Sequence, residues 1–470
     1  MKSTINFDDG SKIILVFLLL MQLLFIDGIY LLGGMAVFFY LFYNLQQPYK
    51  PSIFTIILFY HFIQISAAIW QSNSLGKGIN YRSPNTDTAI VASYIGLLAV
   101  FLPIIFFQNK IPKLNFQKLK DHAYKLSISK TLKVYIISLV VINLLSGIAA
   151  FVPALRQIIL SLGNIKWFVF LLFGFQSIIK NERRKEFYLL CLLEFGIGFL
   201  GYFSDFKTVL FFISIIFLTL LTHFRFNKFL LIIPSLAAIF YGGIFWTSIK
   251  GDYRSFLNKG SKTQTVQVEK GEALNKLIEL SQNTNESSFD GAKASFYDRL
   301  QYTFHFAKTI DRVPSVIPHQ DGANLGSTLS FVLTPRLLDP NKGVYDASTR
   351  ASKYTGIQYN GVKKGTSVSL GYFADCYIDF GIYFMFIPLF IFGYIYGKSY
   401  FYFIRKSSTN YIFNFAVVGA IYMELFAFES DSIFVFGRLY INLMVFFLLR
   451  IFLFPKLHNY IKEPELIIKD

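Results

Sequence analysis

The chain contains about a dozen apolar stretches of membrane-spanning length, spread from one end to the other. A helix needs about 20 apolar residues to cross the hydrocarbon core of a bilayer. Lipid offers the backbone no hydrogen-bond partners, so such stretches must be helical. Hydrophobic residues make up 54% of the sequence and Phe occurs 55 times, outside the usual range of soluble domains. We therefore expect an all-α integral membrane protein with about 12 transmembrane helices.

The expected helices are separated by polar or basic segments. The first apolar run is too long for a cleavable signal peptide, and many further runs follow it. The first two apolar runs either form two helices or belong to one long helix that is broken at Asp27-Gly28, so the number of spans depends on this point. The predicted helices cover residues 12–26, 29–43, 52–70, 89–107, 132–151, 165–179, 187–203, 208–222, 229–249, 371–394, 411–428 and 433–453.

Loops rich in Lys and Arg alternate with less basic loops along the predicted spans. This alternation sets the expected orientation. Cytoplasmic loops of membrane proteins carry an excess of Lys and Arg, which explains the net charge of +17 without a nucleic-acid partner. With both termini in the cytoplasm, the basic segments 110–133, 180–185, 225–228, 398–406 and 456–462 all fall inside. The pattern predicts an N-terminal bundle (1–249), one large extracytoplasmic loop (250–370), and a C-terminal bundle with a cytoplasmic tail (371–470).

The Cys and His residues indicate neither disulfides nor metal binding. Cys191 and Cys376 lie beside or within apolar spans, and no CxxC pair occurs. The six His residues show no HExxH or similar spacing. We predict no catalytic metal and no tightly held cofactor.

The large loop has two parts. Residues 263–294 are polar and are expected to form a flexible insertion with one short helix. In residues 295–310, Phe296, Leu300, Phe304 and Ala307 recur at helical spacing. Two interpretations fit this amphipathic segment: a helix lying in the outer leaflet, or a helix packed on the transmembrane bundle.

Basic residues dominate the end of the loop. A solvated surface is the ordinary interpretation of each charge, but such a cluster at a membrane boundary also suits lipid headgroups or a diphosphate, because Arg pairs bidentately with phosphate oxygens. The residues are Arg336, Lys342, Arg350, Lys353, Lys363 and Lys364, against Asp339 and Asp346.

Short motifs in and around this loop resemble those of the Wzy-type oligosaccharide repeat-unit polymerases. The chain is also similar to that family in having many spans and one large loop before the last helices. It departs from the family in the polar insertion at 263–294 and in having Lys207 where Arg is commoner. The motifs are Pro335-Arg336, Asp339-Pro340-Asn341-Lys342, Gly365-Thr366-Ser367, Gly371-Tyr372, Asp379-Phe380-Gly381 and the turn Ser204-Asp205-Phe206-Lys207.

The resemblance implies an enzyme that joins sugars carried on undecaprenyl diphosphate. A hydroxyl of one lipid-linked oligosaccharide attacks the anomeric carbon of another, and lipid diphosphate leaves. Cations must stabilise the diphosphate. Arg336 and Arg350 are the principal candidates, with Arg254, Arg299 and Lys207 in support. Arg254 directly follows a predicted span, so it equally suits anchoring of that helix end.

A base for the attacking hydroxyl is expected among the outer carboxylates and His305. Asp375 and Asp379 are four residues apart and share one face of a helix. Their alternative role is to stabilise a helix N-terminus. Glu429 and Asp431 are further carboxylates on a short outer loop, and His305 is more simply an interfacial histidine.

Other functions stay open. A ligase related to O-antigen ligases would use the same donor with a different acceptor. A flippase or exporter of lipid-linked sugars would place charges at mid-membrane. A membrane acyltransferase would use an embedded His, for which His61 is the mid-span candidate. The resemblance implies the bacterial cytoplasmic (inner) membrane as location. It implies the lipid-linked oligosaccharide, membrane lipid and a chain-length regulator protein as partners.

Overall fold

The computed structural model describes residues 6–152, 155–201, 206–224, 226–261, 266–283, 286–334, 339, 342–361, 367–422 and 428–464. Within these residues the fold is all-α apart from two short strands. The strands β1 (Asn6–Phe7) and β2 (His223–Phe224) pair in parallel, with Asn6 opposite His223. The all-α prediction is therefore confirmed.

The first half of the chain forms helices close to the predicted spans. The predicted break at the start is present, because Asp27 has a left-handed φ of 58° between the first two long helices. The helices are α1 (Asp9–Met21), η1 (Gln22–Leu24), α2 (Gly28–Leu45), α3 (Ile53–Ser74), η2 (Ile79–Tyr81), α4 (Thr86–Asn109), α5 (Phe116–Tyr124), α6 (Ile128–Phe151), α7 (Arg156–Lys180), α8 (Arg184–Phe199), α9 (Phe206–Leu220) and α10 (Phe226–Leu257).

The second half contains shorter helices followed by a final group of longer ones. These are α11 (Lys270–Gln282), α12 (Glu286–Leu300), α13 (Thr303–Arg312), α14 (Ala323–Leu333), α15 (Ala347–Thr355), α16 (Tyr372–Phe384), α17 (Phe386–Lys406), α18 (Tyr411–Tyr422), α19 (Ser432–Phe452) and α20 (Phe454–Ile461).

Six helices in the described part of the chain are long and apolar enough to cross a membrane. They are α2, α3, α4, α7, α19 and the segment Ile128–Ile148 of α6. The shorter apolar helices are α9, α14 and α18. Length and composition thus identify six candidate spans, and the count of 12 stays a prediction.

The predicted helix over residues 371–394 is two helices, and here the sequence prediction was wrong. Gly381 has φ 67° and ψ −176°, a conformation open mainly to glycine, which interrupts α16 before α17 begins at Phe386. Further along α17, Gly393 and Gly397 let the helix approach α4 closely, because an added Cβ at Gly393 would collide with the carbonyl of Val100.

The segment between α10 and α16 packs against the bundle. Residues 263–294 contain all of α11 and the beginning of α12, instead of one short helix in a flexible insertion. Residues 295–310 form parts of two helices, because the chain breaks between α12 and α13. Phe306 and Ala307 are fully buried, and α13 packs on α3, α4, α15 and α16. The bundle-packed interpretation of this segment is therefore the observed one.

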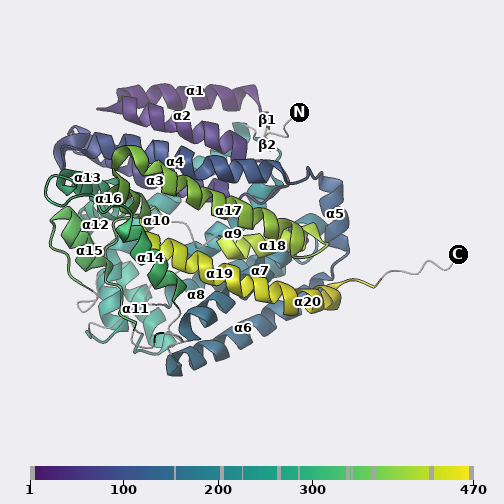
Figure 1. The fold of residues 1–470 in the computed structure, drawn as a ribbon. Helices are drawn as coiled ribbons and strands as arrows, with labels where there is room; N and C mark the ends of the chain where they lie inside the picture. Colours follow the sequence, from purple (N-terminus) through teal and green to yellow (C-terminus); the bar gives the residue numbers. More distant parts are fainter. Residues whose placement is uncertain are drawn as a thin grey trace.

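The loops predicted to be cytoplasmic gather at one end of the long helices. The side-chain amide of Gln47 donates to that of Asn109 at 2.8 Å, and the ammonium of Lys180 donates to the carbonyl of Leu126 at 2.7 Å. Figure 1 shows α5 and α20 at this end and α12–α16 at the opposite end. The assignment of either end to a side of the membrane stays a prediction.

Candidate functional site

Arg350, a predicted diphosphate-binding residue, lies within an acidic network between α15, α16 and α19. Its guanidinium forms a close ion pair with Asp375, and its Nη1 lies 3.9 Å from Oδ1 of Asp431. Its Nη2 donates to Oδ1 of Asn324 at 2.8 Å. The side chain is only 14% exposed. Arg350 is thus largely enclosed by protein groups.

Asp431 is fully buried and accepts several hydrogen bonds. The backbone amides of Leu370 and Gly371 donate to its Oδ1 at 2.7 and 3.1 Å, and the hydroxyl of Tyr345 donates to its Oδ2 at 2.7 Å. Burial and the charge of Asp375 raise the pKa of Asp431 to about 6, against the opposing charge of Arg350. This carboxylate holds the entry to α16 against the start of α19.

Asp375 and Asp379, the two predicted bases, are both buried on α16 and both bind the first residues of another helix. Asp379 accepts the backbone amides of Asn324 and Leu325 at 3.1 and 2.7 Å, which caps α14. Asp375 accepts the amide of Ser432 at 2.7 Å, at the start of α19. The two carboxylates therefore stabilise the starts of the neighbouring helices α14 and α19, and their role at the start of α16 itself stays a prediction.

The charges of this network do not suit a diphosphate. One guanidinium, Arg350, faces two carboxylates directly, and Asp379 adds a third on the same helix. An anionic ligand would be repelled by the surplus negative charge. The arrangement joins α14, α15, α16 and α19, and we interpret Arg350 as part of that structural junction.

A second polar cluster lies where α9, α10 and α12 meet, and it is strongly cationic. The positive charges of Arg299, Arg254 and Lys207 act on Lys250, which directly follows the predicted span of α10. The carboxylate of Glu429 also acts on it. Burial, and then these three cations, lower the pKa of Lys250 to about 7. We call Lys207, Lys250, Arg254 and Arg299 the cation cluster.

Aromatic packing brings the three helices together. The ring of Phe240 on α10 lies 5.2 Å from that of Phe296 on α12. The ring of Trp246, one helical turn before Lys250, lies 5.6 Å from that of Phe206 at the start of α9. Lys207 follows Phe206, and Arg299 follows Phe296 by about one turn. Aromatic contacts thus join the helices that carry these basic residues.

Glu429 connects the cation cluster to the middle of α3. Its Oε2 accepts a hydrogen bond from Nε2 of Gln64 at 2.6 Å. The carbonyl of Gln64 accepts from the amide of Tyr302 at 3.3 Å, and the carbonyl of Ile65 accepts from the hydroxyl of Thr303 at 3.2 Å. The start of α13 therefore sits about halfway along a candidate membrane span.

His305 occupies a separate environment. Its Nδ1 is hydrogen-bonded to the hydroxyl of Tyr359 at 3.0 Å, and its ring lies 4.8 Å from that of Tyr302. Burial, followed by the charge of Arg82, lowers the pKa of His305 to about 4 despite the opposing charge of Asp298. The imidazole is therefore neutral near pH 7.

The structure gathers three of the predicted cations and separates a fourth from them. Lys207, Arg254 and Arg299 lie together, whereas Arg350 lies in the acidic network. Arg336, the other principal candidate, falls outside the described residues. Sequence reasoning missed Lys250, although its position four residues before Arg254 puts both on one helical face.

His61, the candidate catalytic histidine of an acyltransferase, has two partners. Its Nδ1 is hydrogen-bonded to the carbonyl of Ile57 at 2.9 Å, and its Nε2 to the hydroxyl of Tyr372 at 3.0 Å. It lies on α3 and is fully buried against Tyr372 of α16. In the described ranges, no group of three or more His, Cys, Asp or Glu residues is arranged to hold a metal ion.

A family comparison covers both polar clusters. The family model for a domain of unknown function, DUF8712, matches residues 85–436. The chain belongs to this family. The DUF8712 region contains the cation cluster, Glu429 and the acidic network, and leaves out α1–α3 and α20. Comparison with curated proteins and with solved structures gave no match.

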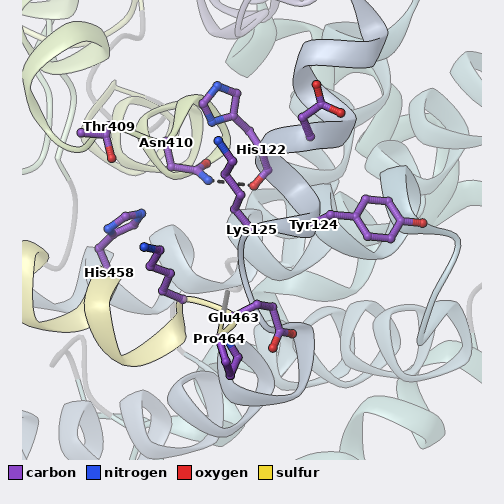
Figure 2. Close-up of a pocket in the computed structure, with 10 residues that line it drawn as sticks. His122, Tyr124, Lys125, Thr409, Asn410, His458, Glu463 and Pro464 are labelled. Atoms are coloured by element: carbon purple, nitrogen blue, oxygen red, sulfur yellow. Dashed lines mark hydrogen bonds between the residues drawn. The ribbon is translucent and has the colours of Figure 1, made fainter. Parts of the chain in front are cut away.

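A cavity of about 450 Å³ lies at the opposite end, among the basic loops (Figure 2). Asp121 and Glu463 balance Lys125 and Lys462 in its lining, and none of the predicted site residues reaches it. The remaining lining residues are His122, Tyr124, Thr409, Asn410, His458 and Pro464. This balanced charge gives the cavity less attraction for a diphosphate than the cation cluster has.

Proposed function

We propose that this protein polymerises undecaprenyl-diphosphate-linked oligosaccharide repeat units by glycosyl transfer. The observation that supports the proposal is the cation cluster, one of whose helices, α12, packs on the candidate span α3 and lies opposite α5 and α20 in Figure 1. Together with the resemblance to Wzy-type polymerases, this arrangement suits a lipid carrier in the bilayer whose diphosphate reaches a cationic site at the outer face.

The two arginines and Lys207 have different tasks in this proposal. Arg254 and Arg299 present planar guanidinium groups that pair bidentately with phosphate oxygens. Lys207 is exposed and adds a mobile point charge. As the bond from the anomeric carbon to the diphosphate breaks, the leaving oxygen gains negative charge, and prearranged cations lower the energy of that state.

The proposal places the chain in the bacterial inner membrane with both termini in the cytoplasm and about 12 spans. The cation cluster then faces the extracytoplasmic side, where completed repeat units are joined. The same cluster would serve an O-antigen ligase-like transferase, because both enzymes share the donor and differ in the acceptor.

A flippase or exporter is the second candidate, and one feature favours it. Lys166, near the middle of α7, forms an ion pair with Glu194 on α8, with Nζ and Oε2 2.8 Å apart. The hydroxyl of Tyr135 on α6 also donates a short hydrogen bond to Glu194. Charges within membrane helices often mark transport pathways.

A reconstituted assay separates these functions. The purified protein in lipid vesicles receives an undecaprenyl-diphosphate repeat unit, and products are resolved on a gel. A ladder of lengthened products supports the polymerase. Movement of the lipid-linked unit across the vesicle membrane without lengthening would instead identify a transporter, and transfer only to a different acceptor would identify a ligase.

A further inference from the structure

The cavity among the basic loops is built from three segments that lie far apart in the sequence. The backbone amide of Glu463 donates to the carbonyl of Lys125 at 3.0 Å, which joins the segment after α20 to the segment after α5. The side-chain amide of Asn410, just before α18, donates to the carbonyl of His122 on α5 at 2.7 Å. The space that these segments enclose, about 450 Å³, is large enough for a small organic ligand.

The lining of this cavity carries more groups that attract an anion than groups that repel one. The positive or protonatable side chains are those of Lys125, Lys462, His122 and His458. One of the two carboxylates, that of Asp121, already accepts a hydrogen bond from the side-chain amide of Gln117 at 2.8 Å. In Figure 2 the carboxylate of Glu463 points away from the imidazoles of His122 and His458. The interior of the cavity therefore offers ammonium and imidazole groups to a ligand.

His122 has a ring nitrogen that no described protein group uses. Its Nδ1 is buried and forms no hydrogen bond within the described residues. The ring packs edge-on against that of Tyr411, with the two centroids 4.9 Å apart. With no acceptor at Nδ1, the neutral imidazole carries its proton on Nε2. The other edge of the ring thus presents an N–H donor to a ligand oxygen.

We propose that this cavity binds the phosphate group of a phosphate monoester, supplied by a soluble metabolite or by the headgroup of an anionic lipid. A phosphate monoester carries a charge of about −1.5 to −2 near pH 7 and three terminal oxygens. Two ammonium groups and two imidazoles match that charge and those oxygens. A diphosphate is less suited, because Asp121 and Glu463 limit the negative charge that the cavity accepts. Tyr124 and Pro464 complete the lining beside the alcohol part of the ligand.

The position of the cavity suits both sources of the phosphate. The helix α20 begins at Phe454, directly after the candidate span α19, so its start lies close to the expected depth of lipid headgroups. Lys125 and Lys462 are exposed, so soluble ligands also reach the cavity. Because α5 and α20 lie at the opposite end of the long helices from α12, this site is separate from the cation cluster and does not depend on glycosyl transfer.

Calorimetric titration with glycerol 3-phosphate, which carries the chemistry shared by both sources, tests the proposal. The protein is reconstituted in phosphatidylcholine vesicles without phosphate in the buffer. The wild type should bind, and Lys125→Met and Lys462→Met should each weaken the affinity about 10- to 100-fold. His122→Phe keeps an aromatic ring against Tyr411 and should weaken it about 3- to 10-fold. Lys118→Met is the control, because Lys118 is exposed on α5 and is absent from the lining.

A second pair of vesicles identifies the source of the phosphate. If the lipid headgroup is the ligand, phosphatidic acid in the vesicles should compete with glycerol 3-phosphate and lower its apparent affinity. Phosphatidylglycerol controls for surface charge, because it is anionic and offers no monoester. Equal affinities with both lipids would assign the site to a soluble phosphate. No binding to the folded wild type, or equal affinities of the wild type, Lys125→Met and Lys462→Met, would overturn the site.

Discussion

Removal of Arg350 should destabilise the fold and leave anion binding intact. The side chains of Asp375 and Asp431 are 2% and 0% exposed, so Arg350→Met leaves two buried carboxylates without their cation. Breaking a buried ion pair from one side costs about 3–5 kcal/mol. Loss of the hydrogen bond to Asn324 adds about 1 kcal/mol. We expect the free energy of unfolding to fall by roughly 4–6 kcal/mol.

Denaturant titration in mixed micelles measures this change. The double variant Arg350→Met/Asp375→Asn removes one of the stranded charges, so it should be at least about 1 kcal/mol more stable than the sum of the single effects predicts. Lys353→Ala on α15 is a control, because Lys353 is exposed and its loss should change stability by about 0.5 kcal/mol or less.

The same variant separates structure from binding. Folded Arg350→Met should bind inorganic pyrophosphate with the wild-type affinity, because Arg350 lies outside the cation cluster. Full stability combined with lost pyrophosphate binding would refute this reasoning, and it would return Arg350 to the role that the sequence first suggested.

Four further predictions follow from the same contacts. Arg299→Ala should weaken pyrophosphate binding by about 10- to 100-fold in calorimetry, since a hydrogen bond to a charged group contributes about 1.5–3 kcal/mol; an unchanged affinity would place the anion elsewhere. Asp379→Ala should lose the cap of α14 and about 0.5–2 kcal/mol of stability, with product ladders retained in the folded fraction. The folded protein holds the proton of Asp431 more tightly than the unfolded chain does. The free energy of unfolding should therefore rise as pH falls from about 6 towards 3.8. In unfolding curves measured at different pH values, Asp431→Asn should flatten this rise. Glu194→Gln should leave ladder formation intact. If the wild type forms no ladder but transports the lipid-linked unit across vesicles, and Glu194→Gln loses that transport, the flippase would be favoured instead.

The positions of the long helices were predictable because lipid imposes a strict requirement on the backbone. Apolar runs of about 20 residues must be helical there, whatever their neighbours are. The ends of α3, α4 and α19 therefore lie within a few residues of their predicted positions. The interruption at Gly381 was missed because it depends on how α16 meets α17, and a glycine within an apolar run does not by itself require a bend.

The site was only partly predictable, because its contacts join distant parts of the chain. The pairing of Arg350 with Asp375 and Asp431 depends on tertiary packing, so the sequence offered no means of finding it. The gathering of Lys207 and Arg299 around α10 depends on aromatic contacts between helices in the same way. Lys250 was the exception, since its spacing from Arg254 was visible in the sequence.

The most direct test of the proposed function is product length from an authenticated lipid-linked repeat unit. Wild type should produce a ladder, Arg299→Ala should lose it while remaining folded, and Arg183→Ala should retain it because Arg183 lies among the basic loops, where it pairs with Glu186. A wild-type protein that binds the substrate and never lengthens it would contradict the polymerase. A ladder that persists in Arg299→Ala would keep the polymerase and contradict the cation cluster as its diphosphate site.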